Sequence, residues 1–457
     1  MSNWRLARAV SELGQLGVVS GTALDQVFAR RLQDGDPGGH MRRALDRFPF
    51  RAMAERVWRK YFVRGGKPPG EPYKPLPMLA AQGPRESLEL CIVSNFAEVF
   101  LAREGHSNPV GINYMEKLQL WHLASVYGAM LAGVSYVLMG AGIPMRIPGA
   151  LDRLAAHEQA AYPLHAAGGD AALAFTPSEF MECALPSLTR PEFLAIISSS
   201  ALATTLARKA NGKVDGFIIE GPTAGGHNAP PRGQLTLNEA GEPVYGERDS
   251  VDLTKIRALG LPFWLAGGCG SAEGLRAALA AGAAGVQVGT AFAFCAESGM
   301  RDDYKAAVLE QLARGEARVF TDPLASPAGF PFKIAGLEGT LSEESVFRAR
   351  RRACDLGYLR EAYRTPQGQI GFRCPAEPVA AYTAKGGGAA VAAHRKCICN
   401  GLMSTAGYPQ VQANGYVEPG VITAGDDLNG IVRFLAPGAA SYRAADVIFH
   451  VLKATNA

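Results

Sequence analysis

Short apolar segments that alternate with helical segments constrain the fold of this chain more than any other feature of its sequence. Between residues 17 and 289, seven apolar segments of four to six residues recur, and helical segments separate most of them. Strands that are apolar throughout are buried on both faces. Their alternation with helices of about ten residues indicates parallel βαβ units. The strands are predicted at residues 17–20, 109–113, 135–139, 193–198, 216–220, 263–266 and 285–289.

The predicted fold class is α/β, in the form of a (β/α)8 TIM barrel. The length of 457 residues suits one such barrel with insertions, because barrels run from about 200 to over 400 residues. A closed barrel needs eight strands, whereas the sequence predicts seven and begins directly on a helix at residues 3–12. The first strand is therefore the missing one, unless another segment closes the barrel.

Two further regions accompany the predicted barrel. The barrel domain is predicted over residues 1–335, with a helical and then proline-rich insertion at about residues 22–85. The alternation of strands and helices stops after about residue 300, and residues 336–457 are predicted to form a C-terminal cap or subdomain. Within it, an arginine-rich helix is predicted at 345–363 and a last helix near 443–454.

Composition excludes several classes of partner and location. The net charge of +4 is small for this length, which argues against a nucleic-acid partner. The densest basic stretch, Arg42 to Lys60, is either a solvated helix face or a dock for an acidic partner, such as a carrier protein or an acyl-CoA. No apolar run approaches the roughly 18 residues of a membrane helix, and no signal peptide is visible. Eight cysteines are too few for a disulfide scaffold, so a reducing cytoplasm is expected.

Two successive strand ends carry glycines that suit a phosphate site. In the segment LAGGCGSAEGLRAALAAGAAGVQVGTAF, from Leu265 to Phe292, one strand runs into Gly267-Gly268 and the next ends in Gly289-Thr290. Glycines let backbone amides approach a phosphate closely, and the N-terminus of the following helix adds free N–H groups. Phosphate sites after strands 7 and 8 recur in barrels. The alternative is that these are tight-turn glycines in a barrel without a ligand.

A second glycine-rich loop carries a single histidine. In IIEGPTAGGHNAPPRG, from Ile218 to Gly233, an apolar strand ends at Glu220 and the loop then presents His227. Imidazole suits proton transfer because its unperturbed pKa is near 6.5. The loop therefore predicts a catalytic histidine, and the alternative is a structural or surface histidine.

The order of these motifs resembles the nitronate monooxygenase family, also called 2-nitropropane dioxygenase-like. The motifs that carry the resemblance are PVGINY, GAGIP, EGPTAGGH, LAGG and VQVGTAF, and the similarity extends over roughly residues 2–335 to include SPAGFPFK. That family includes FMN-dependent enoyl-acyl carrier protein reductases. The chain departs from the family pattern in lacking the initial strand with its Gly-Met-Gly turn, in its larger insertion at 22–85, and in its tail beyond 340.

The resemblance implies FMN as the cofactor and assigns roles residue by residue. Asn113, at the end of PVGIN, would face the flavin, and Gly142, in GAGIP, would lie close to the active site. His227 would be the catalytic base or acid. The loop that packs beside the flavin ring would be Ala224, Gly225 and Gly226. The phosphate would be bound at Ala266, Gly267, Gly268, Gly289 and Thr290, with Gln287 close by.

Four cysteines in the tail raise a separate question. They are Cys354, Cys374, Cys397 and Cys399, which fall within 46 residues. Four thiolates could hold zinc or an iron–sulfur cluster, but their spacing matches no standard zinc finger. They are therefore either a metal site or ordinary buried or free cysteines.

Three functions follow from these expectations. The first is an FMN-dependent oxidoreductase resembling nitronate monooxygenase, which oxidises a small activated-carbon substrate with His227 as base. The second is an NAD(P)H-dependent flavin reductase of enoyl thioesters, for which an acyl carrier protein is a candidate partner. The third is a non-catalytic barrel that binds a phosphorylated ligand. A homodimer is the candidate assembly.

Overall fold

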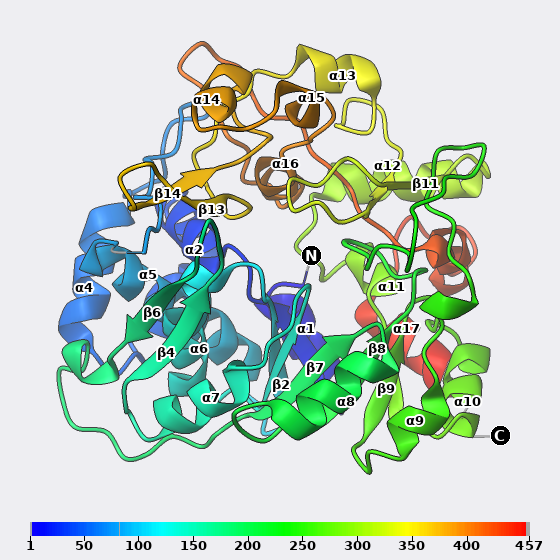
Figure 1. Ribbon diagram of the computed structural model, residues 1–457, viewed down its shortest axis with the longest axis horizontal. Helices are drawn as coiled ribbons and strands as arrows, with labels where there is room; N and C mark the ends of the chain where they lie inside the picture. The colour runs from blue at the N-terminus through cyan, green and yellow to red at the C-terminus, as the bar shows by residue number, and fades with distance from the viewer. Residues whose placement is uncertain (1, 82, 454–457) are drawn as a thin grey trace.

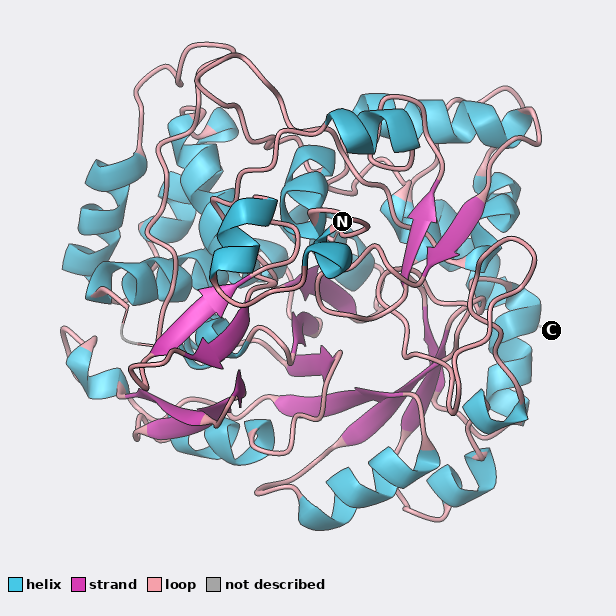
Figure 2. Ribbon diagram, turned by 45° about the horizontal axis from the view of Figure 1, so that its top comes forward, coloured by secondary structure: helices cyan, strands magenta, loops and turns pink. Residues whose placement is uncertain are grey.

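A curled parallel sheet of seven strands forms the centre of the molecule (Figure 2). The computed structural model describes residues 2–81 and 83–453. The strand order is β1-β2-β3-β7-β8-β9-β10, and neighbouring strands pair in parallel. All seven strands were predicted, and their ends agree to within two residues. They are β1 (Gly17–Ser20), β2 (Val110–Met115), β3 (Tyr136–Gly140), β7 (Glu192–Ile197), β8 (Gly216–Glu220), β9 (Phe263–Ala266) and β10 (Gly285–Gln287).

The sheet has two free edges, β1 and β10, so the part of the chain that the structure describes does not close it into a complete barrel. Helix α1 (Trp4–Glu12) contacts α17 (Ala444–Leu452), and α17 also contacts α10 (Ala272–Ala280). These three helices therefore come together on the side of the sheet where the two edges face each other.

Helices cover the outside of the sheet and follow its strands in sequence. Two of them begin at serine caps: Ser199 Oγ accepts from the Leu202 N–H, and Ser271 Oγ accepts from the Gly274 N–H. Besides α10, the helices between the insertion and the tail are α5 (Arg85–Arg103), η2 (Gln119–Trp121), α6 (His122–Leu131), α7 (Ile147–Ala155), η3 (Pro177–Glu179), α8 (Ser200–Lys209), η4 (Glu247–Asp249), α9 (Leu253–Arg257), α11 (Thr290–Ala293) and α12 (Asp302–Ala313).

The predicted insertion is helical and then extended, as its composition indicated. Its helices are α2 (Leu24–Gln33), η1 (Pro37–Gly39), α3 (His40–Leu45) and α4 (Arg51–Tyr61), which lie at the left of Figure 1 beside α5. The rings of Phe48, Phe50 and Phe96 are buried and meet edge to face, which fixes the insertion on α5.

Seven short strands outside the main sheet were not predicted. Alanine-rich segments such as AAYPL and AALAF have weak strand propensity, so pairing rather than local sequence decides their structure. These strands form an antiparallel pair, β4 (Ala160–Leu164) with β6 (Ala171–Phe175), a second pair, β11 (Val319–Asp322) with β12 (Phe332–Ala335), and a small sheet of β5 (Ala166–Ala167), β13 (Glu361–Arg364) and β14 (Ile370–Arg373).

The tail corrects one helix prediction. The expected helix at 345–363 stops at Ala349, and its end becomes strand β13. The reason is tertiary, because the buried guanidinium of Arg350 bonds to the buried carboxylate of Glu418, and Arg350 is extended. The tail helices are α13 (Glu344–Ala349), α14 (Val379–Ala384), α15 (Ala389–Ala392), α16 (Ile398–Thr405), η5 (Asp426–Phe434) and the predicted last helix α17.

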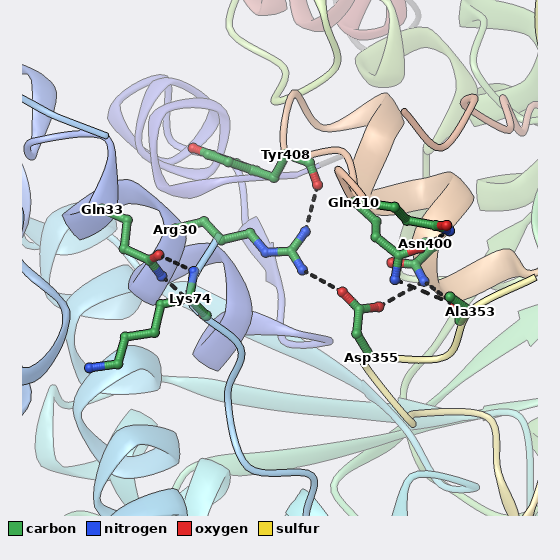
Figure 3. A network of polar contacts seen from close by, with 9 residues as sticks. Arg30, Gln33, Lys74, Ala353, Asp355, Asn400, Tyr408 and Gln410 are labelled. Carbon is green, nitrogen blue, oxygen red and sulfur yellow. Dashed lines mark hydrogen bonds and ion pairs between the residues drawn. The ribbon is translucent and has the colours of Figure 1, made fainter. Parts of the chain in front are cut away.

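The tail is tied to the insertion by a buried polar network (Figure 3). Arg30 of α2 donates to the Tyr408 carbonyl at 2.7 Å and pairs with the Asp355 carboxylate at 3.4 Å. Asn400 of α16 donates to the other oxygen of Asp355 at 2.9 Å. In Figure 1 the tail helices α13 to α16 lie across the top of the molecule, above the N-terminal helix α2, whereas α17 lies at the right.

Candidate functional site

A cavity of about 680 Å3 extends from the carboxyl ends of the central strands along the open side of the sheet to α1, α10 and α17. Its size is that of a small-molecule or cofactor site. Apolar side chains of neighbouring strands, Leu138, Leu194 and Ile218, form its floor. All the predicted cofactor-contact residues except Gly142 line this one cavity: Asn113, Ala224, Gly225, Gly226, Ala266, Gly267, Gly268, Gln287, Gly289 and Thr290.

One wall of the cavity presents backbone rather than side chains. Gly267 and Gly268 have φ angles of +98° and +68°, which favour glycine, and a Cβ on Gly267 would lie 2.7 Å from Thr223 Oγ1. Within the described residues, the N–H groups of Gly268, Cys269 and Gly270 donate no hydrogen bond. Because α10 begins directly afterwards, these free donors and the helix N-terminus follow one another at the cavity wall, an arrangement that suits a phosphate.

The next strand end lies beside the first, because β9 and β10 are parallel neighbours. A Cβ added at Gly289 would meet no atom within 4 Å, so space remains here for a ligand. The hydroxyl of Thr290 accepts from the Gly425 N–H at 2.9 Å, which brings a tail loop to the same place.

Glu220 places a carboxyl group in the cavity at the end of β8. Burial raises the pKa of this carboxyl to about 7. No ion pair or side-chain hydrogen bond to it occurs in the described part of the chain. It can therefore exchange a proton near neutral pH, either as a donor or as an acceptor toward a bound ligand.

His227 directly follows the cavity-lining Gly226 but does not itself line the cavity. Its Nε2 lies 2.6 Å from the buried Ser326 Oγ, and its ring meets Phe332 at 4.8 Å between centroids. The backbone of His227 forms an antiparallel bridge with Phe332, and the Lys333 N–H donates to the Gly226 carbonyl at 2.9 Å. The imidazole is thus held against the start of β12.

The environment of His227 keeps its imidazole neutral. Burial, and secondarily the positive charge of Lys117, lower the pKa of His227 to about 4. At neutral pH a lone pair on one ring nitrogen is therefore available. No described residue bonds to Nδ1, which leaves that nitrogen open to a ligand.

Gly142 is the one predicted contact residue that lies away from the cavity. Its φ is +159°, and a Cβ there would lie 2.1 Å from a carboxylate oxygen of Glu116. That carboxylate accepts hydrogen bonds from Gln119 at 3.1 Å and Tyr162 at 3.0 Å. Gly142 therefore leaves room for the buried polar network of Glu116, Gln119 and Tyr162.

A loop of the tail, Thr423 to Asp427, forms part of the cavity wall. Thr423 Oγ1 accepts from the Gly226 N–H at 2.8 Å, so the tail anchors the residue before His227. Asp427 also lines the cavity, and its Oδ2 lies 3.5 Å from where a Gly270 Cβ would be. A negative charge therefore borders the candidate phosphate site.

Sequence reasoning did not assign roles to Glu220, Lys117, Ser326 or the loop Thr423 to Asp427. A signal existed for Glu220, because it is the only charged residue of the apolar segment GFIIE. Lys117 likewise follows an apolar strand almost immediately. No local pattern marks the tail loop, whose position depends on contacts with residues more than 100 positions away.

The predicted metal site is not supported. Cys374 and Cys397 are buried and pack together with Cys399, and all eight described cysteines are free. Burial raises the pKa of Cys374 to about 12 and that of Cys397 to about 11, which disfavours the thiolates that metals need. Among the residues that the structure describes, no group of three or more His, Cys, Asp or Glu could hold a metal ion. This finding corrects the expectation of zinc or an iron–sulfur cluster at Cys354, Cys374, Cys397 and Cys399.

Ion pairs occupy much of the basic stretch from Arg42 to Lys60. Arg42 pairs with Glu55 at 2.9 Å, Arg56 pairs with the buried Glu89 at 2.9 Å, and Lys60 pairs with Glu86 at 2.7 Å. These contacts reduce the charge that the stretch offers to an acidic partner. No helix in the described ranges is both long and apolar enough to span a membrane.

Comparison with known proteins agrees with the motif pattern. Residues 172–321 match the family model for nitronate monooxygenase. A nitronate monooxygenase of Pseudomonas aeruginosa is 37% identical over 120 residues, which cover 26% of this chain and 32% of that protein. A (3aS,4S,5R,7aS)-5-hydroxy-7a-methyl-1-oxo-octahydro-1H-indene-4-carboxyl-CoA dehydrogenase of Mycobacterium tuberculosis is 32% identical over 163 residues, which cover 35% of this chain and 41% of that protein.

The chain matches less than half of the length of either relative. Among solved structures, FabK from Thermotoga maritima shares 16% identity with a TM-score of 0.47, covering 100% of this chain and 89% of that chain. The matched segment 172–321 contains β7 to β10, the His227 loop and both glycine-rich strand ends. The match of residues 172–321 to the family model and the similarity to a curated nitronate monooxygenase confirm the resemblance inferred from the motifs.

Proposed function

We propose that the protein is an FMN-dependent oxidoreductase that oxidises a small activated-carbon substrate, with His227 as its base. One observation carries the proposal: the glycine-rich strand ends, the loop before His227 and the carboxyl of Glu220 all border a single cavity of about 680 Å3. The proposed fold behind this site is a (β/α)8-type barrel, of which the curled sheet supplies seven strands.

The residues present fit FMN. The free N–H groups at Gly268, Cys269 and Gly270 would hold its phosphate, together with Gly289 and Thr290. Asn113, Gln287 and the loop Ala224 to Gly226 would line the ring. When bound, FMN would supply the redox chemistry by accepting electrons from the substrate carbon and passing them to dioxygen.

The chain itself would orient the substrate and move its proton. In the tautomer whose Nε2–H donates to Ser326 Oγ, the free Nδ1 of His227 would be the proton acceptor. Because the pKa of His227 is lowered to about 4, the imidazole is neutral at physiological pH and can accept a proton on one ring nitrogen. The bond to Ser326 and the contact with Phe332 fix the ring orientation.

Absorbance of the purified protein tests the cofactor, and His227→Ala tests the base. The purified protein should show flavin absorbance, and His227→Ala should retain that absorbance while turnover of a nitronate falls by about 100-fold or more. His394→Ala is the matched control, because His394 is exposed in the tail. Unchanged turnover in His227→Ala would contradict the assigned role. A protein that stays colourless after incubation with FMN would favour the non-catalytic phospholigand-binding barrel.

Oxidoreduction of an acyl thioester is the second candidate function. It is favoured by the similarity to the dehydrogenase of Mycobacterium tuberculosis, whose name specifies a carboxyl-CoA substrate. The apolar side chains of Val447, Ile448 and Val451 on α17 add an apolar wall to the cavity. Stopped-flow bleaching of the flavin distinguishes the two candidate functions. Rapid bleaching by NAD(P)H indicates an enoyl-thioester reductase with an acyl carrier or CoA substrate. Bleaching by a nitronate alone indicates the nitronate monooxygenase-like function.

A further inference from the structure

The charged side chains that line the cavity are all acidic. They are Glu220, at the end of β8, and Asp427, in the tail loop. Among the described residues, no lysine, arginine or histidine belongs to the lining. The side chains of this cavity therefore repel an anionic ligand and supply no positive charge to offset that repulsion.

Glu220 brings this negative charge to the carboxyl ends of the central strands. It follows Ile218 by two positions in β8 and thus points to the same face of the sheet, above the apolar floor of Leu138 and Leu194. Its register partner Ala266 leads directly into the glycine-rich wall. Burial raises the pKa of Glu220 to about 7, so the carboxylate predominates at pH 8.

The backbone N–H groups of Gly268 to Gly270 are the feature of the lining that favours an anion. In the proposed function the FMN phosphate occupies these donors. The phosphate would then lie close to Asp427, whose Oδ2 is 3.5 Å from the position of a Cβ on Gly270. A second anion in the same cavity would face the phosphate and both carboxylates, which makes its binding unfavourable.

Uncharged polar side chains line the same cavity and can hydrogen-bond a neutral ligand. Ser20 and Asn113 are register partners at the ends of β1 and β2, and Gln287 ends β10. Within the described ranges, these three side chains make no hydrogen bond to another residue. A hydroxyl and two amides therefore remain available to a ligand that carries no charge.

We propose that the cavity selects uncharged substrates, and that Glu220 is the specificity-determining residue that excludes anions of the same shape. For a small activated-carbon substrate, the selected form is the carbon acid that still carries its proton, rather than its anionic conjugate base. The inference rests on the proposed function, because it names the substrate class of that site. A substrate that arrives with its proton is also the form that requires a base.

The matched probes are 2-methyl-2-nitropropane and pivalate. Their nitro and carboxylate groups share a planar shape and differ by one charge, and neither molecule has an acidic C–H bond at the substituted carbon, so binding is measured without turnover. Saturation-transfer NMR gives the dissociation constant of each probe from its methyl signal in the purified protein at pH 8. We expect the nitro compound to bind about tenfold more tightly than pivalate, or more, because like charges repel strongly in a partly buried site.

Glu220→Gln should reduce this preference to about threefold or less by tightening the binding of pivalate, while the nitro compound should bind as before. The unmodified protein offers a second measurement that needs no variant. At pH 6 more of the Glu220 carboxyl is protonated, so the preference should shrink. The other titratable side chains of the lining are Cys269, whose pKa burial raises, and Asp427.

Glu239→Gln is the matched control, because Glu239 is exposed and should leave both dissociation constants unchanged. Equal affinities for the two probes at pH 8, an unchanged preference in Glu220→Gln, or no saturable binding of the nitro compound would overturn the proposal. Flavin absorbance is recorded on the same samples. A protein without flavin contradicts the proposed function, whereas the ratio of the two dissociation constants tests the charge selection by itself.

Discussion

Replacing Glu220 with glutamine should stabilise the ligand-free protein at pH 8 and leave its stability nearly unchanged at pH 4. The carboxyl of Glu220 borders the cavity without a cationic partner in the described residues, and burial raises its pKa from 4.5 to about 7. Ionising it in the folded protein is therefore unfavourable. Glutamine has nearly the same shape and carries no charge, so it removes this cost.

The magnitude follows from the linkage between protonation and folding. Below pH 4.5 the carboxyl is protonated in both folded and unfolded chains, so glutamine changes little. As the pH rises from 4.5 to about 7, the unfolded chain loses its proton first, and the wild type loses stability relative to the variant. A pKa displacement of about 2.5 corresponds to at most about 3.4 kcal/mol above pH 7, and water in the cavity reduces this value.

Urea unfolding followed by tryptophan fluorescence at pH values from 4 to 8 measures this effect. The difference in free energy of unfolding between Glu220→Gln and the wild type should grow across this range and then level off. Glu239→Gln is the matched control, because Glu239 is exposed and should give no pH-dependent difference. A difference that stays constant with pH, or a variant that is less stable at pH 8, would refute the assignment of an unfavourable buried carboxylate.

Three further predictions concern the tail. Thr423→Val removes the acceptor for the Gly226 N–H and should weaken FMN binding about fivefold, whereas Thr423→Ser should not. Fluorescence titration measures the FMN affinity of both variants, and equal affinities of the valine and serine variants would contradict this prediction. Asp427→Asn should tighten FMN binding a few-fold at low salt, because it removes charge repulsion between the carboxylate and the FMN phosphate, and high salt should abolish this gain. A gain in affinity that is independent of salt would argue against charge repulsion. Arg350→Met should lower the free energy of unfolding by about 3–5 kcal/mol, because it leaves Glu418 buried and unpaired. The double variant Arg350→Met with Glu418→Met should recover most of this loss in urea unfolding. A double variant that is no more stable than Arg350→Met would contradict this prediction.

The main sheet and most of the candidate site were predictable because their signals are local. Apolar strands such as GFIIE and FWLA, followed by glycine and then a capped helix, define βα units without reference to the rest of the chain. In parallel units all carboxyl ends meet at one face. For this reason Gly226, Gly267 and Gly289 line one cavity although they are far apart in sequence.

Other features could not be read locally. The helix expected at 345–363 has a helical pattern, yet it ends at Ala349 because Arg350 pairs with Glu418 far along the chain. The four tail cysteines carry thiols of the kind that bind metals, but the described residues contain no group arranged to hold a metal ion. Gly142 has the expected turn motif and nevertheless lies over Glu116 rather than in the cavity.

The sequence alone determined the order of the strands, the glycine-rich strand ends of the cavity wall and the loop that carries His227, because periodicity, turn chemistry and helix caps act between near neighbours. Only the tertiary structure decided that Thr423 to Asp427 forms part of the cavity wall, that the carboxyl of Glu220 has no ion-pair partner among the described residues, and that Ser326 contacts the imidazole. These features depend on desolvation and on contacts between distant segments. A pKa or a counter-ion is a property of that assembled environment and not of any stretch of sequence.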